Sequence, residues 1–175
     1  MAIEIERKFL VRGDAWRGAA ERSEAMAQGY LNQVDGLAGG DLASVRVRLE
    51  GPRAALNIKS CEAGRSRQEF EYPVPVEDAR ALLALCTGGR VEKQRHYVPH
   101  GGHLWELDEF EGLNAGLLVA EIELSALDEA FERPDWLGPE VTDYQRYYNI
   151  ALSQRPFSAW SEAEQRGLGE GEDAR

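Results

Sequence analysis

The chain has 175 residues, a hydrophobic fraction of 43% and a formal charge of −11 at neutral pH. This length suits one domain with an ordinary hydrophobic core. The acidic balance argues against nonspecific nucleic-acid binding, and no apolar run is long enough to span a membrane. The first residues predict a strand and not a signal peptide, and cysteines are few, so we expect a cytoplasmic protein.

The N-terminal segment 3–11 alternates apolar and charged side chains, as expected of a strand. Glu4, Glu6 and Lys8 share one face, because successive side chains of a strand point to opposite faces. The alternation returns in six later segments, which fit a period of two better than a helical period. These segments are 45–49, 56–59, 67–72, 91–98, 104–110 and 119–124. An eighth strand is expected at 27–33, where the alternation is weaker.

Few helices are expected. The segment 75–85 has a proline near its start, acids in its first turn and two glycines after its end, all of which are helix boundary signals. The other expected helices span 14–26, 127–133 and 143–152. Residues 1–155 form the one predicted domain, and the acidic segment 156–175 is expected to be a disordered tail.

The charged faces of the predicted strands are segregated by sign. The bases on these faces are Lys8, Arg46, Arg48, Lys59, Arg67, Lys93 and Arg95. The acids are Glu4, Glu6, Glu69, Glu71, Glu106, Asp108, Glu121 and Glu123. Bases gather on 45–49 and 56–59, whereas acids gather on 104–110 and 119–124. A face that is merely solvated explains any one strand but not this set, because like charges opposite one another destabilise a sheet.

An antiparallel barrel with a charged interior explains the segregation better. Eight strands enclose enough space for side chains or for one small ligand. A basic wall attracts a polyanion, whereas clustered carboxylates need a counter-charge to stay ionised. Mg²⁺ or Mn²⁺ fits, because hard ions prefer oxygen ligands and are often shared with substrate phosphates. The two walls together predict a clamp for phosphoryl transfer.

The segment Glu4-Ile5-Glu6-Arg7-Lys8 resembles the ExExK signature of the CYTH superfamily, the triphosphate tunnel metalloenzymes. The resemblance continues over residues 2–155 through Arg46, Arg48, Lys59, Glu69, Glu71, Lys93, Arg95, Asp108, Glu121 and Glu123. It implies an α+β, mainly β fold, in which an eight-stranded antiparallel tunnel carries a few flanking helices. It also implies hydrolysis or cyclisation of a triphosphate with Mg²⁺ or Mn²⁺.

The resemblance implies a role for each group of charged residues. Those expected to bind the triphosphate are Lys8, Arg46, Arg48, Lys59, Lys93 and Arg95. Those expected at the metal are Glu4, Glu6, Asp108, Glu121 and Glu123. Glu4, Glu6 and Lys8 are also expected to serve catalysis, and the two glutamates would complete the metal site or orient the attacking water. The expected supporting residues are Arg67, Glu69, Glu71 and Glu106.

The compact chain is most similar to the short bacterial members with inorganic triphosphatase activity, so tripolyphosphate cleaved to pyrophosphate and phosphate is the favoured reaction. Alternatives are an adenylate cyclase, a thiamine or nucleoside triphosphatase, and a polyphosphate-binding module without hydrolysis. An organic substrate would need stacking aromatics near the tunnel mouth. The candidate aromatics Tyr30, Tyr72, Tyr97 and Trp105 are instead interpreted as parts of the barrel, and Tyr148 is interpreted as part of a helix packed against it. A homodimer is a further expectation.

Overall fold

The computed structural model describes residues 2–32, 43–60 and 66–167. The strands are β1 (Ala2–Val11), β2 (Arg22–Tyr30), β3 (Ala43–Glu50), β4 (Arg53–Ser60), β5 (Ser66–Pro73), β6 (Thr87–His100), β7 (His103–Phe110), β8 (Leu118–Leu124) and β9 (Leu137–Glu140). The α-helices are α1 (Val76–Leu85), α2 (Asn149–Gln154) and α3 (Glu162–Gln165). Short 3₁₀ helices are η1 (Ala15–Ala19), η2 (Gly112–Asn114), η3 (Gln145–Tyr147) and η4 (Phe157–Ala159). Within these ranges, no helix is long and apolar enough to cross a membrane.

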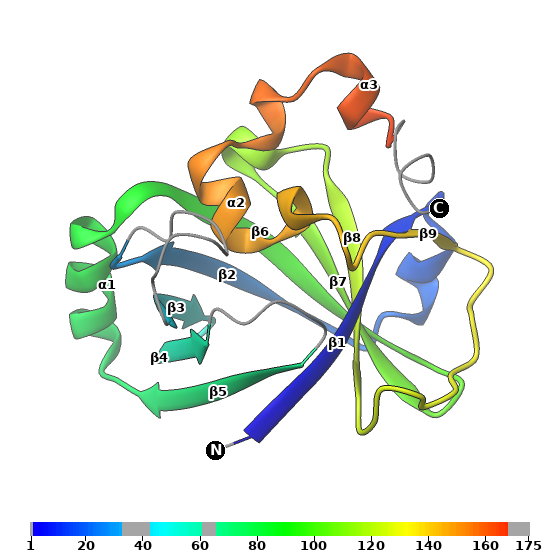
Figure 1. Cartoon of the computed structure of the whole chain (residues 1–175), viewed down its shortest axis with the longest axis horizontal. Helices are drawn as coiled ribbons and strands as arrows, with labels where there is room; N and C mark the ends of the chain where they lie inside the picture. Colours follow the sequence, from blue (N-terminus) through cyan, green and yellow to red (C-terminus); the bar gives the residue numbers. More distant parts are fainter. Residues whose placement is uncertain (1, 33–42, 61–65, 168–175) are drawn as a thin grey trace.

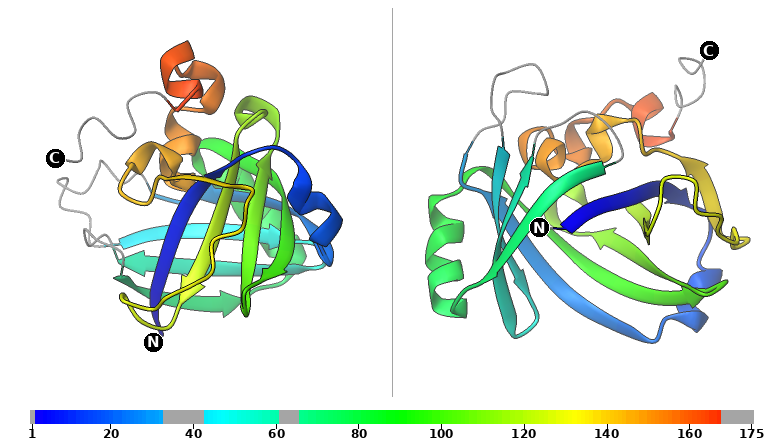
Figure 2. Two further views of the ribbon diagram at one scale, coloured as in Figure 1. Left: turned by 90° about the vertical axis from the view of Figure 1, so that its right-hand side faces the viewer. Right: turned by 60° about the horizontal axis from the view of Figure 1, so that its bottom comes forward.

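All strand pairings are antiparallel and follow the order β5-β4-β3-β2-β6-β7-β8-β1-β9. The first half of β1 also pairs with β5, from Ala2 opposite Glu69 to Ile5 opposite Ser66. The pairings therefore run in a cycle through eight strands, and β9 extends along the end of β1 (Figure 1). The further views in Figure 2 show these strands curving around a common interior. The predicted antiparallel barrel is confirmed, with β9 as a ninth strand that the sequence analysis missed.

Two apolar clusters cover the outer faces of the ring. Phe9, Trp105 and Ile122 lie on the outer side of β1, β7 and β8, where they pack against Trp16 and Trp136. On the opposite side, α1 packs its buried residues against the outer faces of β2, β3 and β4. Burial of this apolar area supplies the main driving force for folding. It also fixes the register, because a slip of one residue would turn every charged side chain of a strand outward.

A third cluster fills one end of the interior. Val91, Phe110 and Val119 share the inner faces of β6, β7 and β8, and they pack against Leu152 and Trp160 from the C-terminal segment. This segment lies over that end of the ring (Figure 1). The charged part of the interior therefore begins where the apolar cluster stops.

Several expectations for single elements were wrong. No long helix covers 14–26: the structure has only η1, and β2 begins at Arg22, because this segment pairs with β6 from Arg22 opposite Tyr97 onward. The segment 127–133 is not helical, and the Glu129 carboxylate accepts hydrogen bonds from Ser125. The helix expected at 143–152 is split into η3 and α2.

The predicted tail is wrong for residues 156–167, which contain η4 and α3. Trp160 is only 5% exposed, and its ring packs edge-on against Tyr147 at a centroid distance of 5.2 Å. Ser161 and Glu164 form a capping box at the start of α3, which satisfies two backbone N–H groups. The aromatic burial and the cap explain why this acidic segment is ordered. Residues 168–175 lie outside the described part of the chain.

Candidate active site

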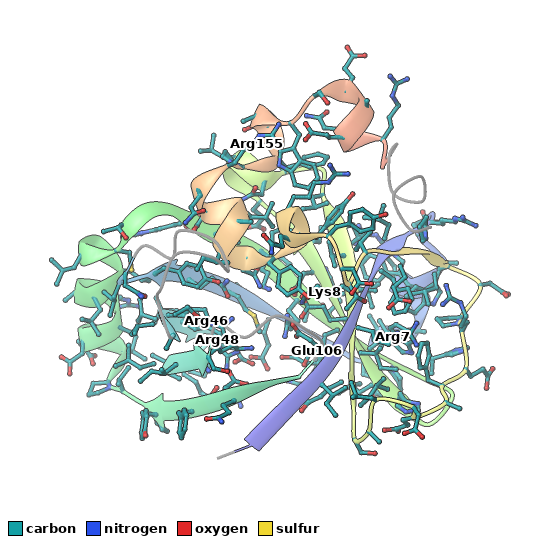
Figure 3. The ribbon with its side chains drawn as sticks, in the orientation of Figure 1. Arg7, Lys8, Arg46, Arg48, Glu106 and Arg155 are labelled. Carbon is teal, nitrogen blue, oxygen red and sulfur yellow. The ribbon has the colours of Figure 1, made fainter. Side chains whose placement is uncertain are left out.

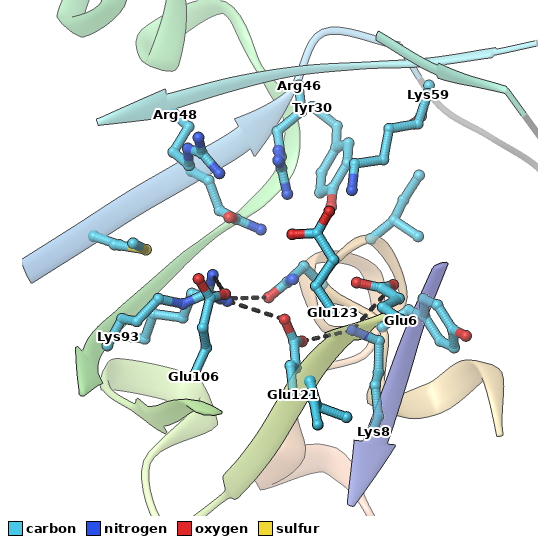
Figure 4. A pocket seen from close by; sticks show the side chains of 18 residues that line it. Glu6, Lys8, Tyr30, Arg46, Arg48, Lys59, Lys93, Glu106, Glu121 and Glu123 are labelled. Atoms are coloured by element: carbon cyan, nitrogen blue, oxygen red, sulfur yellow. Dashed lines mark hydrogen bonds and ion pairs between the residues drawn. The ribbon is translucent and has the colours of Figure 1, made fainter. Parts of the chain in front are cut away.

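A cavity of about 100 Å³ lies within the ring, and it collects most of the charged residues predicted from the sequence (Figure 4). The predicted residues that line it are Glu6, Lys8, Arg46, Arg48, Lys59, Lys93, Arg95, Glu106, Glu121 and Glu123. This set contains six bases and four acids, which gives a formal charge of +2 in a chain whose net charge is −11. The cavity is therefore suited to an anion despite the acidic surroundings.

Strand register brings the charged residues together. Figure 3 places Lys8 and Arg7 on opposite sides of β1, and Arg7 pairs outside the ring with Glu140. On the inner side, Lys8 stands directly opposite Glu121 of β8, and Glu6 stands opposite Glu123. The alternation that predicted one shared face in the sequence thus becomes one shared interior.

One wall of the cavity is a buried ionic network centred on Glu121. Lys8 Nζ donates to Glu121 Oε1 at 2.5 Å and lies 3.2 Å from Glu6 Oε1. Arg95 Nη2 donates to Glu121 Oε2 at 3.0 Å, and Arg95 also binds the carboxylate of Asp108 through Nε at 2.6 Å and Nη2 at 2.7 Å. These contacts hold the basic side chains in fixed positions along the wall.

The buried network shifts the pKa values of its members. Burial alone would raise the pKa of Glu121, but Lys8, Arg95 and Lys93 outweigh it and hold that pKa well below its ordinary value. Burial alone would lower the pKa of Lys8, but Glu121 and Glu6 raise it above its ordinary value. These two groups therefore stay ionised at neutral pH.

Lys93 responds differently. Burial lowers the pKa of its ammonium to about 8, and the neighbouring Arg95 acts in the same direction, whereas Asp108 opposes both. Lys93 also donates to Asp108 and to Asn149 Oδ1, the latter at 3.5 Å. An anion in the cavity would favour the charged form of Lys93.

Asp108 does not line the cavity. Its carboxylate is fully buried and is held by Lys93 and Arg95. Glu106 does line the cavity and accepts a hydrogen bond from Arg95, while burial raises its pKa above the ordinary value. The structure therefore places Asp108 behind the two bases, where it orients them.

The opposite wall carries Arg46, Arg48 and Lys59 on β3 and β4, and its ion pairs are more exposed to water than those around Lys8 and Lys93. Arg48 Nη2 lies 2.9 Å from Glu71 Oε2, Lys59 Nζ lies 3.6 Å from Glu69 Oε1, and Arg46 Nη2 lies 3.9 Å from the same oxygen. Arg46 Nε is buried and lacks a hydrogen-bond partner in the described part of the chain. Guanidinium groups on this wall can therefore share their positive charge with a bound anion.

A buried amide supports this wall from behind. Asn57 is fully buried, and its Nδ2 donates to Glu69 at 3.0 Å and to Glu71 at 2.6 Å. The two glutamates lie beside the bases of β3 and β4 and do not line the cavity. The side chains of Glu4 and Arg67 lie outside the described part of the structure.

A family model, the CYTH domain, matches residues 2–155. The chain belongs to the CYTH family. An inorganic triphosphatase of Acetivibrio thermocellus is 40% identical over 163 residues, which cover 93% of this chain and 100% of that protein. An inorganic triphosphatase of Nitrosomonas europaea is 38% identical over 154 residues, which cover 86% of this chain and 96% of that protein. The crystal structure of the inorganic triphosphatase NE1496 matches with a TM-score of 0.62 and 35% identity, covering 87% of this chain and 95% of that one.

Membership of the CYTH family implies dependence on a divalent metal ion. Among the described residues, no three His, Cys, Asp or Glu side chains form a ready-made metal site. Mg²⁺ often uses only one or two carboxylates and takes its other ligands from substrate phosphates and water. Glu6 and Glu123 fit this type of site, because they are direct cross-strand partners and both line the cavity. Two carboxylates in this arrangement favour a cation between them.

The sequence analysis of this CYTH domain missed several residues that line the cavity. From β2 they are Met26, Gln28 and Tyr30, from β3 Ser44, and from the C-terminal segment Tyr148, Asn149 and Ile150. Tyr148 was interpreted as part of a helix that only packs on the barrel, but its ring centroid lies 5.0 Å from Lys8 Nζ. Uncharged residues gave no signal in a search for charged faces, although the alternation in β2 could have indicated three inward positions.

Proposed function

We propose that this CYTH domain hydrolyses inorganic tripolyphosphate to pyrophosphate and phosphate, with Mg²⁺ or Mn²⁺ as the metal. The observation that carries the proposal is the interior cavity, whose lining has a formal charge of +2 in a chain of charge −11. Relatives that are 38–40% identical along most of the chain are inorganic triphosphatases, which supports the same reaction.

The two walls of the cavity would contribute to binding of the phosphate chain in different ways. Arg46, Arg48 and Lys59 have partly exposed ion pairs and would share their positive charge with the oxygens of the phosphate chain. Lys93 and Arg95 face them from a rigid network and contribute fixed positive charge. Phosphoryl transfer depends mainly on such positioning and on neutralisation of charge in a site of low dielectric constant.

Glu6 and Glu123 would hold the metal ion, and Glu4 stays assigned to it by the resemblance of the N-terminal motif. A bound divalent ion would neutralise charge on the phosphate chain and favour attack at its terminal phosphorus. Lys8 pairs with the Glu6 and Glu121 carboxylates and holds them in place at the edge of this site. In hydrolysis the oxygen of water would bond to the terminal phosphorus as the bond from that phosphorus to the bridging oxygen breaks. Pyrophosphate would leave with the bridging oxygen, and the proton lost by water would pass to solvent or to a product oxygen.

A substrate panel tests the proposal. Purified protein is incubated with tripolyphosphate, ATP or thiamine triphosphate, each with Mg²⁺ or Mn²⁺, and the products are separated by anion-exchange chromatography. We expect pyrophosphate and phosphate from tripolyphosphate as the fastest reaction, and none in EDTA. Cyclic AMP from ATP without free phosphate would instead identify a cyclase, and binding of tripolyphosphate without turnover would identify a binding module.

A pair of matched variants assigns the activity to the cavity. Arg48→Met removes a base of the wall formed by β3 and β4, whereas Arg12→Met removes an exposed arginine that does not line the cavity. We expect Arg48→Met to raise KM for tripolyphosphate and to lower kcat, and Arg12→Met to match the unmodified protein. Equal activity of both variants would show that the reaction takes place elsewhere.

A further inference from the structure

Gln28 occupies an unusual position on the inner face of the ring. It alternates along β2 with Met26 and Tyr30, and all three side chains line the cavity. Its backbone stands opposite Arg48 of β3 on one side and Val91 of β6 on the other. Only 1% of its surface is exposed, so this polar side chain has left bulk water almost completely.

The Gln28 amide nitrogen has no hydrogen-bond partner in the described part of the chain. Buried amide donors are nearly always paired, because an unpaired donor loses its hydration without compensation. Asn57 gives the direct comparison: it is a second buried amide on the inner face, and its nitrogen donates to both Glu69 and Glu71. The Asn57 donor is therefore satisfied by the scaffold, although the Asn57 Oδ1 has no partner among the described residues. The Gln28 side chain differs because it lines the cavity and its donor has no partner among them.

The surroundings of Gln28 indicate which kind of group would accept a hydrogen bond from its amide nitrogen. Its cross-strand neighbour Arg48 lines the same cavity, as do Lys93 and Arg95. A cationic ligand would be repelled here, and the missing partner of an N–H donor must be an acceptor. An oxygen that carries negative charge satisfies both conditions.

We infer that Gln28 Nε2 donates a hydrogen bond to a phosphate oxygen of bound tripolyphosphate, at the level of Arg48. The inference rests on the proposed function, and it adds a neutral, directional donor to the charged clamp. Lysine and arginine charges attract a phosphate chain over a range of positions, whereas an amide donor is satisfied only at hydrogen-bond distance. Gln28 thereby sets the position of the chain along the tunnel and favours one phosphate register.

The test uses Gln28→Met, which keeps the length of the side chain and removes both polar atoms. The matched control is Gln94→Met, the same change on β6 at a position that does not line the cavity. We expect kcat/KM for tripolyphosphate to fall about tenfold to hundredfold in Gln28→Met and to stay unchanged in Gln94→Met, as for loss of a hydrogen bond to a charged group. The midpoint of urea unfolding of Gln28→Met should equal or exceed that of the unmodified protein, because the variant removes an unpaired buried donor.

A lower unfolding midpoint or failure to fold would show that Gln28 is structural and would overturn the inference, as would unchanged kcat/KM. Calorimetric titration with tripolyphosphate in EDTA separates this result from failure of the proposed function. If the unmodified protein binds tripolyphosphate without hydrolysing it, the proposed reaction is wrong, yet Gln28→Met should still weaken binding about tenfold or more. Equal affinity of the two proteins would contradict the inference in either case.

Discussion

Arg95 and Arg48 line the same cavity, but the structure predicts very different effects on stability when each is replaced by methionine. The Arg95 side chain is only 10% exposed, and it binds Asp108, Glu121 and Glu106. Its loss would leave Asp108, which is fully buried, with Lys93 as its remaining basic partner among the described residues. Breaking a buried ion pair by removing one partner costs about 3–5 kcal/mol.

Arg48 provides the matched control. Its side chain is 19% exposed, and its partner Glu71, at 2.9 Å, is 48% exposed. An ion pair that water reaches in this way contributes about 0–1 kcal/mol. Both substitutions should reduce activity, because both remove positive charge from the cavity, so activity alone does not separate the two roles.

Urea unfolding at pH 7, followed by circular dichroism, measures the difference. With a denaturant slope of about 2 kcal/mol per molar urea, Arg95→Met should lower the unfolding midpoint by roughly 1.5–2.5 M, and Arg48→Met by less than about 0.5 M. The expected loss for Arg95→Met is a large share of the roughly 5–15 kcal/mol that stabilises a typical domain. Equal midpoints for the two variants would refute the reasoning that burial makes Arg95 part of the scaffold.

Glu123→Gln should raise the Mg²⁺ concentration needed for half-maximal activity about tenfold or more. The control Glu111→Gln, at an exposed position, should leave this concentration unchanged. If both variants needed the same Mg²⁺ concentration, Glu123 would not be a metal ligand. The folded-state pKa of Glu121 is depressed, so its ionised form stabilises the protein above pH ~4.5 and this stabilisation is lost as the pH falls further. The unfolding midpoint of Glu121→Gln should therefore approach that of the unmodified protein between pH 7 and pH ~3, and a constant difference would contradict the assigned ionisation. Trp160→Ala should lower the free energy of unfolding, measured in urea, by about 3–5 kcal/mol. The control Leu113→Ala, at an exposed position, should lower it by less than about 0.5 kcal/mol. A small loss for Trp160→Ala would mean that the C-terminal segment is not packed on the barrel.

The charged strands were predictable because a period of two leaves a direct trace in the sequence. Glu6 and Lys8 on β1, and Glu121 and Glu123 on β8, were assigned to one face, and the register brings these two faces together. What the sequence does not carry is the difference between a carboxylate that lines the cavity and one that stands behind it. Asp108 and Glu121 look alike in the sequence, but only the folded ring shows that Asp108 is covered by two bases.

The errors at the start of β2 and in the C-terminal segment have a common cause. The local sequence pattern favoured a helix at 14–26, but the residues from Arg22 onward form a strand because they pair with β6, which is distant in the sequence. The segment 156–167 looked polar overall, but Trp160 is buried in the apolar end of the ring and Phe157 packs beside it. Tertiary contacts of this kind are not visible in a short window of sequence.

A crystal structure of the protein with tripolyphosphate and Mg²⁺, in the Glu123→Gln background if turnover is fast, tests the central claim most directly. We predict density for the phosphate chain inside the ring, with oxygens within hydrogen-bond distance of Arg46, Arg48 and Arg95. Density for the chain only on the outer surface, with the interior unchanged, would contradict the account.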